Sequence, residues 1–279
     1  AIGPLTILNK KFMPLLYNRR HLGVTMFTVA LIHGAYSINW FHGAGNVNPM
    51  VSLFISNTSY HSFPAFPFQV LGFFALVIFF VMAITSHDFW LHNLSPRIWK
   101  TIHMFVYLAY VLVVMHVMLG VVQLEKNPVF VVLVLGGAVT LITLHLLAAA
   151  KEKKTDNMKF TLQQDGFVHV CEVKDIEESR AKIFCIDEER IAVYKHEGKL
   201  YGIHNVCKHQ GGPLGEGKIA DGCITCPWHG YQYLPANGQS PPPFTEKVST
   251  YDVRVTEGKV WLNPKPYAEG TERPGAMIN

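Results

Sequence analysis

Two short pairs of cysteine and histidine lie close together in the last third of the chain. Cys207 and His209 are separated by one residue. After sixteen intervening residues comes Cys226, and two further residues separate it from His229. Thiolate and neutral imidazole are the ligands of zinc sites and of certain iron–sulfur clusters. A two-iron, two-sulfur cluster can be held by two thiolates on one iron and two imidazoles on the other, so each pair would supply one ligand to each iron.

The same four ligand types also occur in zinc sites. Zinc fingers take both cysteines from one short motif and both histidines from another, whereas each motif here contains one of each. The pattern therefore favours the cluster over zinc. The other three cysteines are expected to be free thiols, because an odd total argues against a complete disulfide framework; they are Cys171, Cys185 and Cys223.

The loops around these residues resemble the Rieske iron–sulfur domains over about Lys159–Pro264. The resemblance rests on Cys207-x-His209 with Gly211-Gly212-Pro213-Leu214, on Cys226-Pro227-Trp228-His229-Gly230, and on a proline-rich loop that follows. It implies a small all-β domain. It also implies that Cys207 and Cys226 bind the inner iron of a [2Fe-2S] cluster, and that His209 and His229 bind the outer, exposed iron.

Three positions distinguish the kind of Rieske domain. Gly212 and Trp228 stand where the Rieske proteins of cytochrome bc complexes have two disulfide-bonded cysteines, and Tyr231 stands where they have a serine. Tyr233, two positions later, keeps an aromatic hydroxyl. The domain therefore looks like the ferredoxins of aromatic-ring dioxygenases, with a potential expected toward the lower end of roughly −150 to +300 mV.

Four histidines in the first half have matched spacings. His21 and His33 are twelve residues apart, and His103 and His116 are thirteen apart. On α-helices each pair would lie on one face and be separated by roughly 18–20 Å. Two such helices running in the same direction bring His21 to His103 and His33 to His116, which is the geometry of two stacked bis-histidine b haems.

A single histidine within a membrane helix is more often an interhelical hydrogen-bonding residue than a ligand. The matched spacings favour haem ligation for His33, His103 and His116. For the fourth ligand His21 has two competitors, His145 and His87, which project to the same level of the membrane.

The histidines fall in a half of the chain that is poor in charge. Only nine of the first 150 residues are Lys, Arg, Asp or Glu, against 35 of the remaining 129. A water-soluble domain needs a more highly charged surface, so lipid must cover the first half. Four apolar stretches are long enough to cross the bilayer as helices: Leu22–Trp40, Val70–Ser86, Ile98–Val122 and Val129–Ala150.

This half resembles the ferric-reductase-like transmembrane domain over roughly Tyr17–Ala150. NADPH oxidases, ferric reductases and the haem-binding membrane subunit of bacterial methionine sulfoxide reductase share that domain. The resemblance rests on the run from Asn18 to Gly23, on His33, and on Trp99 with His103 and His116. In that family the counterparts of His33, His103 and His116 bind haem. Two departures are the four spans where members often have six, and the lack of a flavin or nicotinamide domain, which leaves the electron donor unidentified.

The distribution of basic residues predicts the orientation in the membrane. With four spans, the first residues, the Ser86–Arg97 connection and the segment after Ala150 share one face, and this face carries almost all the Lys and Arg of the first half and its borders. The Phe41–Gln69 loop on the other face has no charged residue. By the positive-inside rule the β domain lies in the cytoplasm and the protein in the inner (cytoplasmic) membrane.

In the second half, apolar and polar residues alternate with the period of two that is typical of short strands. A closing hairpin is expected around Glu257-Gly258. The predicted fold is therefore two-part, a four-span α-helical bundle followed by a small all-β domain. The predicted divisions are residues 1–150 for the membrane haem domain, 151–158 for a charged linker, 159–264 for the Rieske domain and 265–279 for a tail.

These features predict a membrane-bound electron-transfer protein that passes electrons between a cytoplasmic [2Fe-2S] cluster and two b haems, as an oxidoreductase component. Its expected partners are the lipid bilayer, other redox subunits or a soluble electron carrier, and quinone. No basic, aromatic-interleaved patch suggests nucleic acid. Two alternatives remain, a ferric-chelate or oxygen reductase acting at the outer haem, and a non-catalytic redox or assembly subunit of a respiratory complex.

Overall fold

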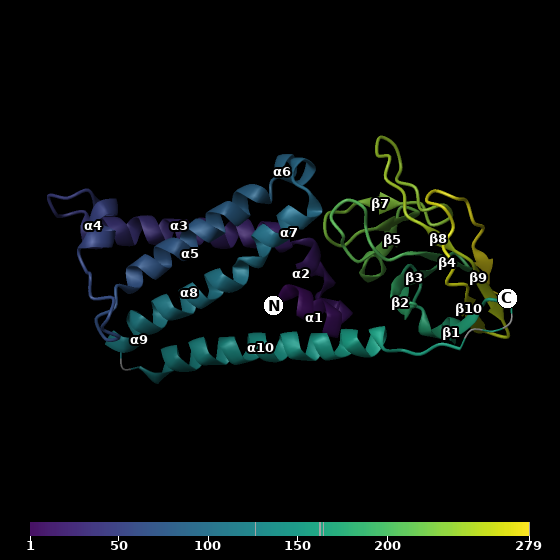
Figure 1. Cartoon of the computed structure of the whole chain (residues 1–279), viewed down its shortest axis with the longest axis horizontal. Helices are drawn as coiled ribbons and strands as arrows, with labels where there is room; N and C mark the ends of the chain where they lie inside the picture. Colours follow the sequence, from purple (N-terminus) through teal and green to yellow (C-terminus); the bar gives the residue numbers. More distant parts are fainter. Residues whose placement is uncertain (126, 162, 164, 279) are drawn as a thin grey trace. The chain divides into compact units, whose positions relative to one another are not determined.

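The structure, a computed structural model, describes residues 1–125, 127–161, 163 and 165–278 (Figure 1). The chain forms two compact units. One comprises residues 18–143, and the other comprises residues 1–17 together with 144–279. The sequence pattern instead groups residues 1–17 with the membrane half.

The first unit is helical, and its helices contain the predicted membrane spans. In the described part of the chain, four helical stretches are long and apolar enough to cross a membrane: Arg19–His42, Phe68–Thr85, Pro96–Gln123 and Pro128–Asp156. The helices are α3 (Arg19–His42), α4 (Pro49–Ile55), α5 (Phe68–Thr85), α6 (Asp88–Asn93), α7 (Pro96–Met104), α8 (Val106–Leu119), α9 (Val121–Leu124) and α10 (Pro128–Asp156), the last shared by both units. Helix α5 packs against both α3 and α8.

The third span is not the single helix that the hydropathy pattern predicts. At Phe105 the backbone N–H bonds to the carbonyl of Ile102, three residues back, which tightens the helix for one turn between α7 and α8. At Gly120 the backbone leaves the helical region, with φ −97° and ψ −101°. A β-carbon on Gly120 would lie 2.8 Å from the Phe68 ring, so the close approach of α5 requires a glycine here.

The second unit begins with three short helices, α1 (Ile2–Leu8), η1 (Lys10–Phe12) and α2 (Met13–Tyr17). The end of α10 also belongs to it. The charged stretch expected as a linker, residues 151–158, is helical as far as Asp156 because α10 continues without a break from the last span. The domain limits given by the sequence remain a prediction.

The rest of this unit is the predicted all-β domain, and its described strands form three sheets. One sheet has the order β1 (Val168–Glu172), β10 (Lys259–Leu262), β9 (Val253–Thr256). The second has the order β11 (Ala276–Met277), β4 (Lys199–His204), β3 (Glu189–His196), β2 (Ala181–Ile186), with β8 (Thr250–Tyr251) also paired to β4. The third has the order β5 (Lys218–Ala220), β6 (Cys223–Thr225), β7 (Gln232–Tyr233). Two 3₁₀ turns, η2 (Val173–Asp175) and η3 (Leu214–Glu216), complete it.

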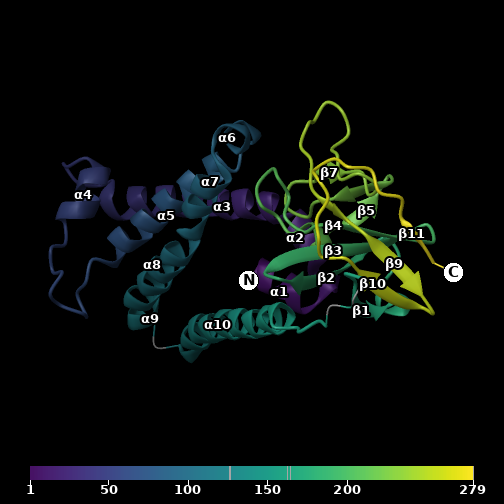
Figure 2. The same cartoon turned by 45° about the vertical axis from the view of Figure 1, so that its right-hand side comes forward.

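Strand β3 is the centre of this domain (Figure 2). Its residues Ile191, Ala192, Val193 and Tyr194 are all fully buried, because successive side chains point to opposite faces and both faces are covered. Ala192 and Tyr194 belong to one apolar cluster, which includes the candidate ligands Cys207 and Cys226. Ile191 and Val193 belong to another, under β1, β9 and β10. One face of β3 thus supports the candidate site, and the other face anchors the domain.

The Gly215→Ala variant tests how tightly the turn after the first cysteine loop is packed. An added β-carbon would lie 2.6 Å from Ile183 Cγ1 and 2.9 Å from Asn205 Oδ1. Overpacking and a disturbed buried hydrogen bond should cost about 3 kcal/mol. We expect the melting temperature of the full chain in detergent to fall by about 10 °C. Near-ultraviolet circular dichroism, recorded as the temperature is raised, measures it.

The control for Gly215→Ala is Gly258→Ala, in the β9–β10 turn. A β-carbon there meets nothing within 4 Å, and only the positive φ of 73° is unfavourable. It should lower the melting temperature by less than about 5 °C. Equal effects of the two substitutions would contradict the packing described here.

Candidate metal centres

The two loops that carry Cys and His are closed by the same pair of backbone hydrogen bonds. The N–H of Cys207 donates to the carbonyl of Gly212, and the N–H of Gly211 donates back to the carbonyl of Cys207. The second loop repeats this with Cys226, Tyr231 and Gly230 at the equivalent positions. Gly211 and Gly230 have φ of 71° and 72°, which favours glycine at the fourth position after each cysteine.

The four side chains form two pairs. Cys207 and Cys226 are only 2% and 1% exposed and belong to the same buried cluster. The rings of His209 and His229 are half-buried and meet edge to face, with centroids 5.2 Å apart. Among the described residues no three His, Cys, Asp or Glu side chains converge as on one metal ion. Two sulfurs inside and two imidazoles outside match the donor set of a two-iron cluster.

The surroundings leave space around the two sulfurs and stabilise negative charge on that of Cys207. A β-carbon on Gly212 would lie 2.9 Å from Cys226 Sγ and 3.0 Å from the Trp228 ring, so the absence of a side chain at Gly212 keeps the sulfur free of steric contact. Hydrogen bonds from Cys226 and from Tyr233 lower the pKa of the Cys207 thiol, against the effect of burial. A thiol held in this way is prepared to act as a thiolate ligand.

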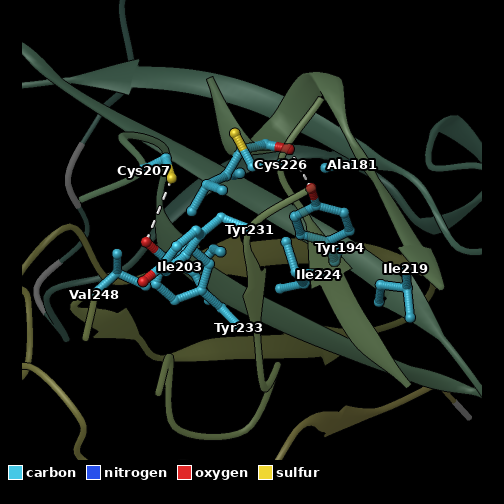
Figure 3. Packing of buried hydrophobic residues seen from close by; sticks show 12 residues of the cluster. Ala181, Tyr194, Ile203, Cys207, Ile219, Ile224, Cys226, Tyr231, Tyr233 and Val248 are labelled. Carbon is cyan, nitrogen blue, oxygen red and sulfur yellow. Dashed lines mark hydrogen bonds between the residues drawn. The ribbon is translucent and has the colours of Figure 1, made fainter. Parts of the chain in front are cut away.

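Tyr233 provides a direct hydrogen bond to the cysteine pair (Figure 3). Its hydroxyl lies 3.4 Å from Cys207 Sγ and accepts a 3.1 Å hydrogen bond from the N–H of Lys208. Burial and the nearby Cys207 raise the pKa of Tyr233. The hydroxyl therefore keeps its proton and can donate it to the sulfur.

Tyr194 and Asn205, which the sequence patterns did not indicate, hold the first loop in place. The Tyr194 hydroxyl, from β3, donates to the carbonyl of Leu214, and the N–H of Gly215 donates to Asn205 Oδ1 at 2.7 Å. Tyr231 stacks on His209, with centroids 4.8 Å apart and planes 10° apart. No spacing rule predicts these contacts. The only sequence signal is the aromatic pair Tyr231 and Tyr233 directly after the second loop.

In the helical unit the structure brings His33 of α3 and His116 of α8 together. Their ring centroids are 6.5 Å apart and their planes differ by 73°. Two imidazoles on opposite sides of one metal, each with a metal–nitrogen distance of about 2 Å, have centroids about 6 Å apart. A β-carbon on Gly72 of α5 would lie 2.8 Å from the His116 ring, so this glycine makes room for the imidazole.

The orientation of His116 is fixed by its second nitrogen. Nδ1 lies 2.8 Å from the carbonyl oxygen of Phe68, and because a carbonyl only accepts, Nδ1 carries the proton. The lone pair is then on Nε2. Metal-binding histidines commonly have this arrangement, in which the N–H that faces away from the metal is held by a carbonyl.

The structure does not bring the other predicted pair together in the same way. The Nδ1 of His103 bonds to the Trp99 carbonyl at 3.0 Å, its ring stacks on Trp99, and its Nε2 lies 3.2 Å from the Ser86 hydroxyl. His21 is an exposed residue in the first turn of α3 and, among the described residues, has no ring contact with His103. Of its competitors, His87 caps α6 and His145 lies in α10.

A β domain with paired Cys and His side chains on two loops, joined to four membrane-length helices, is the arrangement of a membrane-anchored iron–sulfur redox protein. Residues 166–252 match the Rieske [2Fe-2S] domain, and residues 3–114 match the ferric reductase like transmembrane component. The chain therefore belongs to the Rieske [2Fe-2S] family, and its Rieske domain is fused to a ferric reductase-like transmembrane domain.

Several characterised proteins are similar to part of the chain. The anthranilate 1,2-dioxygenase ferredoxin subunit of Burkholderia cepacia is 34% identical over 77 residues, which are 27% of this chain and 71% of that protein. The ferredoxin component of the alkene monooxygenase system of Xanthobacter autotrophicus is 29% identical over 101 residues, 36% of this chain and 83% of that protein. Among solved structures, the ferredoxin of carbazole 1,9a-dioxygenase from Nocardioides aromaticivorans is 24% identical, with a TM-score of 0.34, covering 36% of this chain and 98% of that one.

These findings confirm the two predicted families, the fold class and a [2Fe-2S] cluster, and support a membrane electron-transfer protein. The ferric reductase-like domain suggests haem. All five cysteines are free of disulfide bonds.

The Tyr233→Phe variant tests the hydrogen bond to Cys207. Hydrogen bonds to ligand sulfur stabilise the reduced cluster, so losing one should lower the reduction potential. We expect a decrease on the order of 50 mV, which corresponds to about 1 kcal/mol for one electron. An EPR-monitored redox titration measures it. Tyr267→Phe, whose hydroxyl bonds to Asp252, is the control and should not change the potential. An unchanged or higher potential in Tyr233→Phe would show that the hydroxyl does not donate to the sulfur.

Proposed function

We propose that the chain carries electrons between a Rieske cluster at the membrane surface and two b haems within the membrane. Cys207, Cys226, His209 and His229 hold the cluster, and His33, His116, His103 and His21 hold the haems. Each of these cofactors takes up and releases one electron. The observation that carries the proposal is the pair of identically hydrogen-bonded loops that gathers two buried thiols and two half-buried imidazoles.

The exposed part of the cluster site is its contact with partners. The cysteine pair is buried, so His209 and His229 are the ligands that another protein can approach. The relatives from Burkholderia cepacia and Xanthobacter autotrophicus are ferredoxin components of oxygenase systems. By analogy, a soluble electron carrier or another redox subunit exchanges electrons with this chain at the same edge.

The outer haem is assigned to His33 and His116 because of their 6.5 Å ring separation and the Phe68 carbonyl that orients His116. His103 is assigned to the inner haem, with its Nδ1 held by the Trp99 carbonyl. Its Nε2, which lies 3.2 Å from the Ser86 hydroxyl, would bind the iron in place of that hydroxyl. His21 is its proposed partner, with His145 and His87 as the alternatives. The inner haem faces the cytoplasm together with the Rieske domain, according to the distribution of Lys and Arg.

The far side of the membrane is the proposed place of a quinone or a partner subunit. The connection there is uncharged and ordered around His42, whose ring nitrogens lie 2.9 Å from Ser52 Oγ and 3.2 Å from Gln69 Oε1. An uncharged, internally bonded connection suits contact with an apolar molecule better than contact with water. The chain would thus act as a subunit of a membrane oxidoreductase.

The decisive experiment is a redox titration of the purified protein followed by low-temperature EPR and visible spectroscopy. We expect one Rieske-type signal and two b-type haem transitions per chain. Absence of a Rieske signal, or haem content near zero, would reject the proposal. Reduction of ferric chelate or oxygen by the isolated chain would instead favour the reductase alternative, since a subunit that only passes electrons on has no such activity alone.

The assignment of the outer haem predicts the effect of His116→Ala. Without its imidazole one of the two haems should be lost, while the Rieske EPR signal keeps its intensity. The haem content, measured by the pyridine haemochrome assay and divided by the number of Rieske spins, should fall from two to one. His61→Ala, an exposed loop residue, is the control and should retain two. Two haems in His116→Ala would contradict the assignment.

The fourth ligand is tested by His21→Ala. If His21 binds the inner haem, the variant should lose that haem and keep the outer one, with one bis-histidine signal remaining in the EPR spectrum. The variants His145→Ala and His87→Ala should then keep both. If His21→Ala keeps two haems, the fourth ligand is instead His145 or His87. It is the one whose alanine variant loses a haem.

A further inference from the structure

Within the second unit, the end of α10 is bonded to the Rieske domain through Arg190. This residue of β3 forms two hydrogen bonds to Asp156, from Nε at 2.9 Å and from a terminal nitrogen at 2.7 Å. Its other terminal nitrogen lies 2.5 Å from Glu152 Oε2. Single surface ion pairs contribute little, but a forked arginine on two carboxylates of one helix is the favourable exception.

The N-terminal helices are bonded to the same two elements. Lys151 of α10 donates to the last carbonyls of α1, those of Ile7 at 2.5 Å and Leu8 at 3.4 Å, which have no partner within their helix. Lys10 donates to the carbonyl of Ala181, the first residue of β2, at 3.3 Å. Residues 1–17, the end of α10 and the Rieske domain are thus connected pairwise.

The contact has a buried apolar part and a partly exposed polar part, in which the Arg190 and Glu152 side chains are 30% and 32% exposed. Met13 and Leu16 of α2 are each only 3% exposed. Glu216, in the turn that ends the first cluster loop, is faced by Glu152, Arg190, Lys10 and Lys151, and burial with the nearby Glu152 raises its pKa to about 7. Burial also lowers the pKa of Lys10. Both shifts have the direction that partial burial produces.

We propose that residues 1–17 and the last turns of α10 form a platform on which the Rieske domain is held in one fixed orientation. Arg190 is the positioning residue of this contact. The cluster then works without a swinging movement of the Rieske domain, because its domain is bonded directly to the continuation of a membrane-spanning helix. This goes beyond the proposed function, which would hold equally for a Rieske domain on a free tether.

Oriented membranes containing the full-length protein test the fixed orientation. If the Rieske domain is held on α10, the reduced-cluster EPR signal should change strongly with the angle between the membrane and the magnetic field. In Arg190→Ala this angular dependence should be largely lost, while the spin count stays the same. Arg273→Ala is the matched control, since Arg273 pairs with Asp252 inside the Rieske domain, and it should keep the angular dependence.

A second measurement does not need the cluster. Trypsin cleavage after Lys153 and Lys154 requires the end of α10 to unwind, and it should be on the order of tenfold faster in Arg190→Ala than in the native chain. Cleavage after Lys159, which is exposed and lies outside the helix, is the internal reference and should not change. If the cluster itself were absent, the proposed function would fail while this measurement still tested the platform.

The outcomes of the two measurements distinguish a fixed Rieske domain from a freely tethered one. An angle-independent signal in the native protein, or unchanged orientation and cleavage in Arg190→Ala, would overturn the proposal. If Arg190→Ala does not fold, the double variant Glu152→Gln, Asp156→Asn removes the same charges from α10 without altering the Rieske domain. It should then show the same loss of orientation and the same faster cleavage.

Discussion

The fold of the β domain depends on one constraint, that the Cys and His side chains of two separate loops must lie close together. Both loops meet it with the same backbone hydrogen bonds, from the cysteine N–H to the carbonyl five residues on and back from a glycine. Neither loop is regular secondary structure, so the surrounding sheets must hold it. Tyr194 of the central strand and Asn205 do so by bonding the turn after the first loop. The apolar cluster on one face of β3 then packs directly beneath the cysteines.

The helical part follows a related rule, because imidazoles in a membrane require partners. His116 uses a backbone carbonyl for one nitrogen and faces His33 with its ring, and Gly72 and Gly120 allow α5 to approach closely. His103 is held by Trp99 and Ser86 instead. The Phe68 carbonyl and Gly72 of α5 therefore position His116 of α8, and Ser86, directly after α5, contacts His103 of α7.

The features that were predictable from the sequence were those with a period or a fixed spacing. The long spans and the strands β2 to β4 have clear patterns, and the Cys and His pairs have a specific spacing. Strands β5 to β7 have two or three residues each and carry no recognisable alternation. The charged sequence of residues 151–158 predicts a linker, whereas Glu152 and Asp156 in the helical end of α10 face Arg190, 34 or more residues away. Such a contact depends on tertiary structure and leaves no local pattern.

The site also qualifies the expectation of a low potential. That expectation rests on what is missing, the disulfide and the serine of the cytochrome bc type, and Gly212, Trp228 and Tyr231 agree with it. Tyr233, however, brings a protonated hydroxyl to 3.4 Å from Cys207 Sγ, and a hydrogen bond to ligand sulfur favours the reduced state. The stacked Tyr231 offers His209 a ring face instead of a donor. One such hydrogen bond is kept and two stabilising features are lost. The reduction potential of the cluster should therefore lie above that of a centre without Tyr233 and below that of a centre of the bc type. In the proposed function, the direction of electron flow then depends on the reduction potentials of the two haems relative to this intermediate value.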